Sequence, residues 1–303
     1  MDDLKKRLTK DGSISLYSLN YEEGFHSTEG ALKESINKYL LPAQLDKFAN
    51  TEKIVVLDVC MGLGYNSGCV LEDLLQRNQK IEWHGLEIDQ RPLSIGLNEK
   101  KFQKLWSPQV LKFFNCLKES QKWVEGSNEG TIHWGDARQK LYELKDSLRF
   151  DLILLDPFSP QKCPELWSEQ FISLLSARLS IDGRLITYSS ASSVRASLKR
   201  AGLRIYSIIP SIDEQNKWSS GTVALKKRIE EQLISKNCLI KDLSTRELEH
   251  LATRSSIPYR DPTGRGNSNE IILNRAIEQS KSQLTNTSSW RKRWNSAQWQ
   301  ESN

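Results

Sequence analysis

The chain has 303 residues, of which 38% are hydrophobic and 27% are charged, and its formal net charge is +5. These proportions are typical of a globular protein of one or two domains that folds in water, and they exclude a disordered chain. No run of about 18 apolar residues, no apolar leader and no C-x-x-C pair occur, so we predict no membrane span, no disulfide framework, no metal site and a cytoplasmic location.

The positive charge is concentrated at the carboxyl-terminal end. Residues 1–225 contain 29 basic and 29 acidic residues, whereas residues 226–303 contain 14 and 9. We therefore predict a lead-in of residues 1–49, a main domain of residues 50–226 and a basic, mostly helical extension of residues 227–303. The extension contains Trp290, Trp294 and Trp299. It either binds phosphates and bases of nucleic acid or packs as a solvated helix on the main domain.

From about residue 50, short apolar runs alternate with helical patterns, which is typical of an α/β protein with a parallel sheet. Seven strands are predicted, at residues 53–59, 81–88, 131–135, 150–156, 184–189, 204–209 and 222–226. A loop rather than a helix separates the last two strands, so we expect them to pair as an antiparallel hairpin.

The helical patterns have recognisable ends. Helices are predicted at residues 30–40, from Asn66 onward, at residues 164–182 with Gly183 as a stop, and at residues 193–201 closed by Gly202. In the extension, residues 229–234, 242–252, 270–284 and 290–299 look helical, and a Pro/Gly/Ser-rich break occupies residues 255–269.

The first predicted strand ends in a glycine-containing turn. Asp58 is followed by Gly62 and Gly64, and the next helix begins near Asn66. Glycines at this position let a ligand approach backbone amides at a helix N-terminus. The following glycine is Gly68, one residue too late for a G-x-G-x-x-G dinucleotide motif, although a pair of turn glycines is also often structural.

Acidic residues follow the next two strands. Glu87 closes the second strand, where a carboxylate can accept both ribose hydroxyls of an adenosine, and Asp136 follows the third, where it can accept from an adenine amine. Each acid alone could be a helix cap or a surface residue. Together with Asp58 they follow three successive strands, which indicates one shared crevice.

The fourth strand ends in Asp156-Pro157-Phe158-Ser159-Pro160. The strand itself is apolar, so the carboxylate emerges at the edge of the sheet in front of the predicted ligand, on a turn stiffened by prolines. A structural turn aspartate is the alternative. Position, rigidity and the following aromatic residue together favour a functional carboxylate.

These residues resemble the class I S-adenosylmethionine-dependent methyltransferases, and among them the methyltransferase domain of the tRNA 5-methylaminomethyl-2-thiouridine biosynthesis family, MnmC. The acidic-x-Gly-x-Gly-x-Gly motif is matched by Asp58, Gly62 and Gly64, with Cys60 replacing the first glycine, and a Gly-x-Gly-x-Asn turn adds Asn66. A fourth-strand block is matched by Leu155, Asp156, Phe158, Pro160, Lys162, Pro164 and Trp167. A later block is matched by Thr187, Ser190, Ala191, Val194, Arg195, Leu198, Ala201 and Gly202, so that the resemblance covers about residues 15–226.

The resemblance implies a class I Rossmann-like sheet and methyl transfer from S-adenosylmethionine to the amine of 5-aminomethyl-(2-thio)uridine at the wobble position, with the tRNA anticodon region as partner. It makes Asp156 the catalytic residue. The residues that it implies for the methyl donor are Asp58, Gly62, Gly64, Asn66, Glu87 and Asp136. Those that it implies for the substrate are Phe158, Pro160, Lys162, Trp167 and Arg195. Trp167 could instead be a core anchor, and solvent exposure alone would explain Lys162 and Arg195.

Three features depart from the family pattern. Pro157 stands where glycine is frequent, a basic Gly-Arg-Lys-Arg stretch near the final hairpin is absent, and the FAD-dependent oxidase half is missing, so we predict no flavin chemistry and leave a separate oxidase partner open. The alternatives are a methyltransferase acting on a protein or small-molecule amine, a nicotinamide-dependent oxidoreductase, which the glycine spacing disfavours, and a non-catalytic RNA-binding protein.

Overall fold

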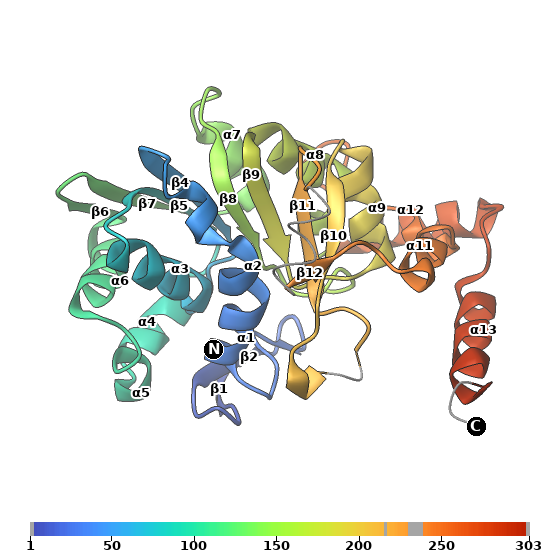
Figure 1. The fold of residues 1–303 in the computed structure, drawn as a ribbon, viewed down its shortest axis with the longest axis horizontal. Coiled ribbons are helices and arrows are strands. Elements are labelled where there is room, and N and C mark those ends of the chain that lie inside the picture. Colours follow the sequence, from blue (N-terminus) through green and yellow to red (C-terminus); the bar gives the residue numbers. More distant parts are fainter. Residues whose placement is uncertain (1–2, 215–216, 230–238, 301–303) are drawn as a thin grey trace. The chain divides into compact units, whose positions relative to one another are not determined.

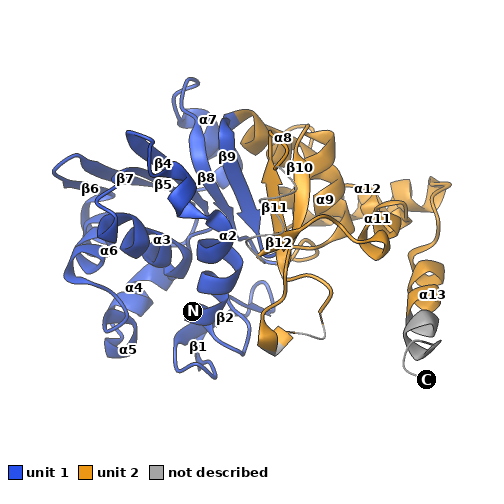
Figure 2. Ribbon diagram, in the orientation of Figure 1, with its two compact units in different colours: residues 1–158, 178–188 blue, residues 159–177, 189–303 orange. Residues whose placement is uncertain are grey.

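The computed structural model describes residues 3–214, 217–229 and 239–300 (Figure 1). They form two compact units (Figure 2). Unit 1 comprises residues 1–158 and 178–188, and unit 2 comprises residues 159–177 and 189–303. The lead-in therefore belongs to unit 1 and the basic extension to unit 2, while the three-part division at residues 49 and 226 stays a prediction.

The strands of unit 1 are neighbours in the order β9, β8, β4, β5, β7 and β6. The first five are parallel, and β6 pairs antiparallel with β7. Their bounds are Lys53–Val59 for β4, Lys80–Glu87 for β5, Lys122–Glu125 for β6, Asn128–Trp134 for β7, Phe150–Leu155 for β8 and Leu179–Thr187 for β9. The α/β fold class and the parallel strands are confirmed, whereas β6 was not among the seven predicted strands.

Five helices of unit 1 accompany these strands: α3 (Tyr65–Gln76), α4 (Arg91–Leu97), α5 (Lys100–Gln103), α6 (Pro108–Ser120) and α7 (Ala137–Glu143). An aromatic core joins the sheet to α6, because Phe113 packs edge-on against Trp83 and Trp123 at ring distances of 5.0 and 5.3 Å. All three rings are buried, and their burial is a major part of what holds α6 in place.

The lead-in is built into unit 1. Strands β1 (Leu4–Leu8), β2 (Ile14–Ser18) and β3 (Glu23–Gly24) form a small antiparallel sheet. The predicted helix at residues 30–40 is present as α1 (Ala31–Ser35), continued by the π-helical η1 (Ile36–Leu40), α2 (Leu41–Ala43) and the short η2 (Leu45–Phe48). The Tyr65 hydroxyl of α3 bonds to both the amide and the carbonyl of Ile14, and this pair of bonds ties β2 to the main part of the unit.

Unit 2 contains the predicted terminal hairpin. Strand β10 pairs antiparallel with both β11 and β12. The strands are Arg204–Ile208 for β10, Gly221–Leu225 for β11 and Ile240–Lys241 for β12. The helices are η3 (Pro164–Trp167), α8 (Glu169–Arg178), α9 (Ser192–Arg200), η4 (Ile212–Glu214), α11 (Thr245–Leu251), η5 (Arg254–Ser256), α12 (Ser268–Lys281) and α13 (Thr287–Gln300). Most of the predicted helix at residues 229–234 lies outside the described residues.

One predicted helix end is wrong. Helix α8 ends at Arg178, and the chain enters β9 at once, so Gly183 lies within a strand and is not a helix stop. A side chain at this position would place its Cβ 2.7 Å from the Phe150 carbonyl oxygen. Gly183 is therefore explained by the close approach of the β8 backbone.

In the part of the chain that the structure describes, no helix has the length and apolarity to cross a membrane. The same residues include no group of three or more His, Cys, Asp or Glu side chains arranged to hold a metal ion.

Candidate functional site

The turn between β4 and α3 has a backbone that favours glycine. Gly62 and Gly64 have φ values of +57° and +95°, and Cys60 has a φ of +68°. Cys60 therefore adopts a left-handed conformation that glycine takes without strain, at a cost of about 1–2 kcal/mol. Its amide donates to the Leu86 carbonyl at 2.8 Å, which anchors the turn to β5. Gly64 is the N-cap of α3 and has no side chain to satisfy the first helical amides.

Glu87, at the end of β5, holds this turn. One carboxylate oxygen accepts from the Gly62 amide at 2.8 Å, and the other accepts from the amides of Ile88 and Asp89 at 2.7 and 2.9 Å. Burial raises the pKa of Glu87, and the three amide bonds oppose that rise. Because a carboxylate can accept about four hydrogen bonds, one position remains for a ligand hydroxyl.

Asp58 lies at the end of β4 and is completely buried. Its Oδ2 accepts from the Ser67 hydroxyl at 2.5 Å, and the Ser67 oxygen accepts from the Trp83 indole at 2.8 Å. Burial raises the pKa of Asp58 to about 7. Its other oxygen, Oδ1, is buried and has no hydrogen-bond partner among the described residues, so a buried acceptor is left for a donor group.

Asp136 is the N-cap of α7. It accepts from the Arg138 amide at 2.9 Å and forms an ion pair with the Arg138 guanidinium at 2.7 Å. The helix-cap alternative considered for this residue is thus realised. About a quarter of its side chain, 26%, stays exposed, so the carboxylate is still accessible to an amine donor.

Asp156 follows β8, and two side chains donate hydrogen bonds to its carboxylate. Its Oδ1 accepts from the Tyr39 hydroxyl at 2.6 Å, and its Oδ2 accepts from the Asn66 amide at 2.7 Å. Burial raises the pKa of Asp156 to about 8, and the charges of Glu34 and Asp58 act in the same direction, whereas the bonds from Tyr39 and Asn66 lower it. Near neutral pH this carboxyl group can therefore both hold and release a proton.

Sequence reasoning missed Tyr39. It lies on η1 in the lead-in, is buried, and accepts from the Tyr188 amide at 3.3 Å besides donating to Asp156. It belongs to the predicted helix of residues 30–40, but no local signal connects it with a residue 117 positions later. Asn66, which the resemblance assigned to the methyl donor, holds Asp156 through its Nδ2, while its buried Oδ1 has no hydrogen-bond partner among the residues that the structure describes.

Phe158 is surrounded by aromatic residues of the lead-in. Tyr21 stacks on it with ring centroids 4.4 Å apart, and Phe25 meets it edge-on at 5.1 Å. The Phe25 ring also lies against the glycine turn, since a Cβ at Gly62 would be 3.2 Å from it. The loop itself is fixed by the Tyr188 hydroxyl, which donates to the Pro157 carbonyl at 2.9 Å. Turn, loop and lead-in therefore form one cluster in unit 1.

The other predicted substrate residues belong to unit 2. Pro160 and Lys162 are partly exposed, and Trp167 is completely buried, as expected for a core anchor. Arg195 needs a correction, because it is only 1% exposed and its guanidinium is occupied within unit 2. It pairs with Glu247 at 2.7 Å and donates to Thr222, Ser219 and the Gly221 carbonyl. We therefore withdraw the phosphate contact for Arg195.

The tryptophans of the extension pack on α11. Trp290 is buried and stacks on His250 with ring centroids 4.3 Å apart, and Trp294 donates to Glu249 at 2.7 Å. The Trp299 side chain lies outside the described residues. For Trp290 and Trp294 the structure favours the packing alternative over stacking on bases.

The residues present in unit 1 fit a ligand that carries an adenosine and an amino acid. The turn offers backbone amides at a helix N-terminus, and Glu87 has a remaining acceptor position. Asp58 and Asn66 each have one buried oxygen to which no group in the described part of the chain donates. A ligand with hydroxyl and ammonium donors would satisfy acceptors of this kind.

Comparison with known proteins gives a consistent result. Residues 100–218 match a family model described as S-adenosyl-L-methionine-dependent methyltransferase. An uncharacterized protein of Methanocaldococcus jannaschii is 30% identical over 200 residues, which are 65% of this chain and 53% of that protein. The tRNA 5-methylaminomethyl-2-thiouridine biosynthesis bifunctional protein MnmC of Azoarcus sp. is 29% identical over 199 residues, or 62% of this chain and 31% of that protein.

A solved structure extends the match. The chain in the crystal structure of MNMC2 from Aquifex aeolicus is 28% identical in sequence to this chain, and the two structures superpose with a TM-score of 0.77. The match covers 92% of this chain and 86% of that chain. The chain thus spans about half the length of the Methanocaldococcus relative and about a third of the bifunctional relative.

Proposed function

We propose that this chain, an S-adenosyl-L-methionine-dependent methyltransferase with a domain of the MnmC type, methylates the amine of 5-aminomethyl-(2-thio)uridine at the wobble position of tRNA. The predicted family, the methyl donor and the enzyme class are confirmed by the comparisons. The substrate is our proposal, together with the residue roles and the cytoplasmic location that a tRNA substrate implies.

The observation that carries the proposal is the Asp156 carboxylate, held between Tyr39 and Asn66 beside the glycine turn. An alkylammonium has a pKa near 10, so an amine substrate must lose a proton before nitrogen can attack. Transfer to a carboxylate whose pKa is about 8 is uphill by ~3 kcal/mol, against ~8 kcal/mol for an aspartate of ordinary pKa. Burial thus raises the basicity of the Asp156 carboxylate toward that of the amine from which it must accept the proton.

The methyl donor, when bound, supplies a methyl group on a sulfonium that a nitrogen lone pair can attack. We assign the backbone around Gly62 and Gly64, and the acceptors of Asp58, Glu87 and Asn66, to holding it. Asp136 is assigned to the adenine amine. Asp156 accepts the amine proton and orients the nitrogen, and alignment within the site provides much of the remaining acceleration.

Phe158 is assigned to the uracil ring. An anticodon base must leave its stack to reach an enzyme pocket, and exposed bases are commonly bound by aromatic side chains. Tyr21 and Phe25 hold the Phe158 ring, so the lead-in contributes to the same surface. Pro160 and Lys162 remain candidates for the substrate backbone.

Tyr39→Phe should shift the pH dependence of turnover. The variant keeps the ring and removes a donor that lowers the pKa of Asp156, so this pKa should rise above about 8. Since the carboxylate form is the active one, the rising limb of kcat against pH should move to higher pH, with a clear loss at pH 7.5 and partial recovery at pH 9. Measured kcat values between pH 6 and 9.5 provide the test.

Tyr65→Phe is the matched control, because it removes another buried hydroxyl whose partner is Ile14. For Tyr65→Phe, the rising limb of kcat against pH should lie at the same pH as in the wild type. A Tyr39→Phe limb at the wild-type position would contradict the role of Tyr39.

The substrate can be tested by transfer of a labelled methyl group from S-adenosylmethionine to tRNA. We expect incorporation into tRNA that carries 5-aminomethyl-2-thiouridine and none into the same tRNA with an unmodified wobble uridine. Equal labelling of both, or labelling only of proteins or small amines in an RNase-treated extract, would favour one of the alternative methyltransferases.

A further inference from the structure

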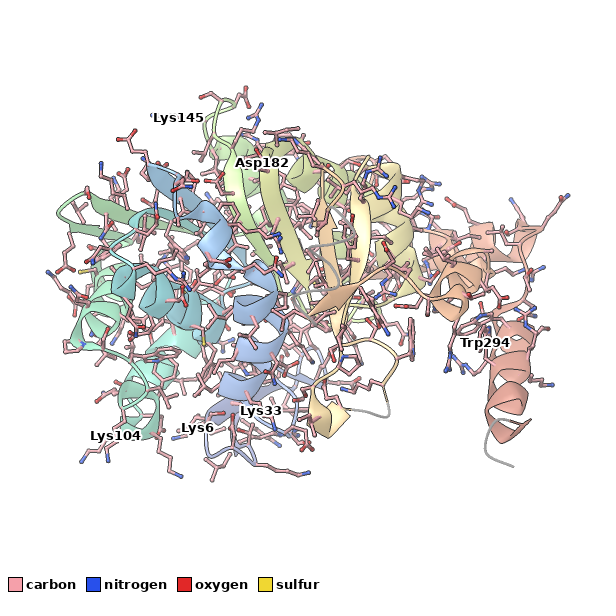
Figure 3. The ribbon with its side chains drawn as sticks, viewed as in Figure 1. Lys6, Lys33, Lys104, Lys145, Asp182 and Trp294 are labelled. Atoms are coloured by element: carbon pink, nitrogen blue, oxygen red, sulfur yellow. The ribbon has the colours of Figure 1, made fainter. Side chains whose placement is uncertain are left out.

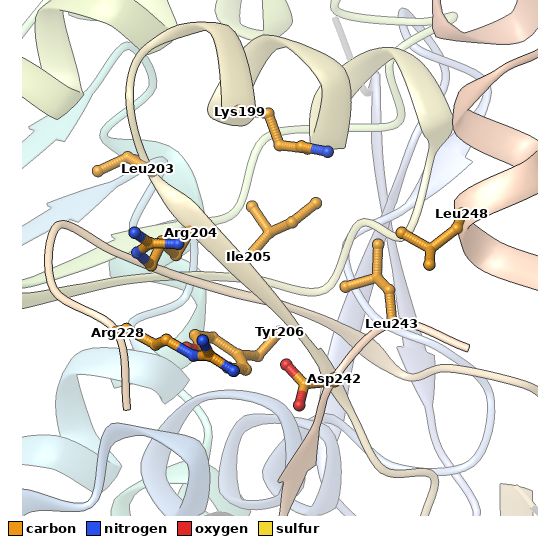
Figure 4. Close-up of a pocket in the computed structure, with 9 residues that line it drawn as sticks. All are labelled: Lys199, Leu203, Arg204, Ile205, Tyr206, Arg228, Asp242, Leu243 and Leu248. Atoms are coloured by element: carbon orange, nitrogen blue, oxygen red, sulfur yellow. The ribbon is translucent and has the colours of Figure 1, made fainter. Parts of the chain in front are cut away.

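Unit 2 contains a pocket of about 340 Å³ that the proposed chemistry does not use (Figure 4). Its walls come from the last turn of α9 with the loop that follows it, strand β10, the segment after β11, the segment between β12 and α11, and α11 itself. None of the residues implied for the methyl donor or the amine lines it. Its volume is in the range of pockets that bind a small molecule or one unit of a polymer.

The charged lining of the pocket is mainly positive. Lys199, Arg204 and Arg228 contribute three cations, and Asp242 contributes one carboxylate. Among the described residues, neither Lys199 nor Arg204 has an ion-pair partner, whereas Arg195, Arg200 and Arg260 of the same unit each pair with a glutamate. Two cations at one pocket that have no ion-pair partner in the described part of the chain favour an anionic ligand.

The rest of the lining is largely apolar. Leu203, Ile205, Leu243 and Leu248 line the pocket together with the Tyr206 ring. The Tyr206 hydroxyl accepts from the Ile229 amide at 3.0 Å, and this bond fixes the ring. Figure 4 shows Arg204 and Arg228 toward one side of the pocket and Leu243 and Leu248 toward the other. A nucleotide of an RNA chain combines the two matching parts, a phosphate and an apolar ring face.

From this combination we infer that the pocket binds a backbone phosphate of the RNA substrate, with the adjoining nucleoside against its apolar side. The inference rests on the proposed function, since it takes RNA as the substrate. It gives unit 2 a docking role and places RNA contacts on Lys199, Arg204 and Arg228 in place of the buried Arg195. A phosphate contact of this kind adds affinity that does not depend on sequence.

The test compares binding of an unmodified tRNA transcript to the full chain and to the double variant Lys199→Gln/Arg204→Gln. Each phosphate contact contributes about 0.7–0.9 to the slope of log affinity against log salt. Because the two substituted cations meet the same phosphate, the double variant should bind roughly tenfold more weakly at 0.1 M salt, with a slope smaller by about 0.7–0.9. Turnover at saturating tRNA and binding of S-adenosylmethionine should be unchanged.

Lys104→Gln/Lys145→Gln is the matched control, because it removes two exposed cations that belong to unit 1 (Figure 3) and are not among the residues that line the pocket. This control variant should keep most of the wild-type affinity for tRNA.

Wild-type binding by the pocket variant, or equal weakening by both double variants, would overturn the inference. So would a pocket that takes inorganic phosphate or a mononucleotide while the salt slope for tRNA stays unchanged. Failure of the proposed function gives a different result, in which tRNA binds with the expected slopes but receives no methyl group.

Discussion

Asp156→Asn is expected to lower kcat on undermodified tRNA by about three orders of magnitude, within the range of general-base catalysis. The amide is nearly the same size as the carboxylate but cannot accept the ammonium proton. The residue can still accept from Asn66 through its oxygen and donate to the Tyr39 oxygen through its nitrogen, in place of the two accepted bonds of 2.6 and 2.7 Å that hold the wild-type carboxylate. Single-turnover rates with saturating methyl donor measure the loss directly.

Two further measurements separate this loss from a folding defect. Calorimetry should give nearly the wild-type affinity for S-adenosylmethionine, since the acceptors assigned to the donor are other residues. The control is Asp151→Asn at the opposite end of β8, where the carboxylate bonds to the Val55 amide and the Ser180 hydroxyl. It should retain turnover. Wild-type turnover in Asp156→Asn would refute the role of this carboxylate.

Glu247→Ala is expected to lower the free energy of unfolding by about 3–5 kcal/mol, because it leaves the charge of Arg195 buried without its counterion. The side chains of the pair are 2% and 0% exposed, and the N···O distance is 2.7 Å. Glu247 also completes the capping box of α11 with Ser244, so the variant loses a helix cap as well. Urea unfolding gives the value.

Arg195→Met/Glu247→Leu is the informative comparison. Replacing both members of a buried pair by apolar residues is often close to neutral, so this variant should be much more stable than Glu247→Ala. It should also bind tRNA like the wild type if Arg195 is structural. Loss of tRNA affinity at unchanged stability would instead assign a phosphate contact to Arg195.

The sheet was largely predictable because its strands are buried on both faces. Runs such as residues 152–155 are entirely apolar and completely buried, and they are bounded by turn residues. The small sheet of the lead-in has no such signal. Strand β1 is mostly exposed and reads Leu-Lys-Lys-Arg-Leu, so neither burial nor alternation identifies it.

The candidate site was predictable where it follows strand ends. Asp58, Glu87, Asp136 and Asp156 all lie immediately after or at the end of parallel strands, where side chains converge. The contacts between them depend on tertiary packing. Tyr39 reaches Asp156 across 117 residues, and the partner that buries Arg195 lies 52 residues later, in the extension. Because arginine side chains are rarely buried, the sequence favoured the prediction that Arg195 lies at the surface.

The most direct test is mass spectrometry of tRNA nucleosides from cells that lack this protein, complemented with the wild-type chain or with Asp156→Asn. We predict that the methylaminomethyl nucleoside disappears from the wobble position while its aminomethyl precursor accumulates, and that only the wild-type chain reverses the change. Unaltered wobble nucleosides in the deletion strain, or full restoration by Asp156→Asn, would contradict the account.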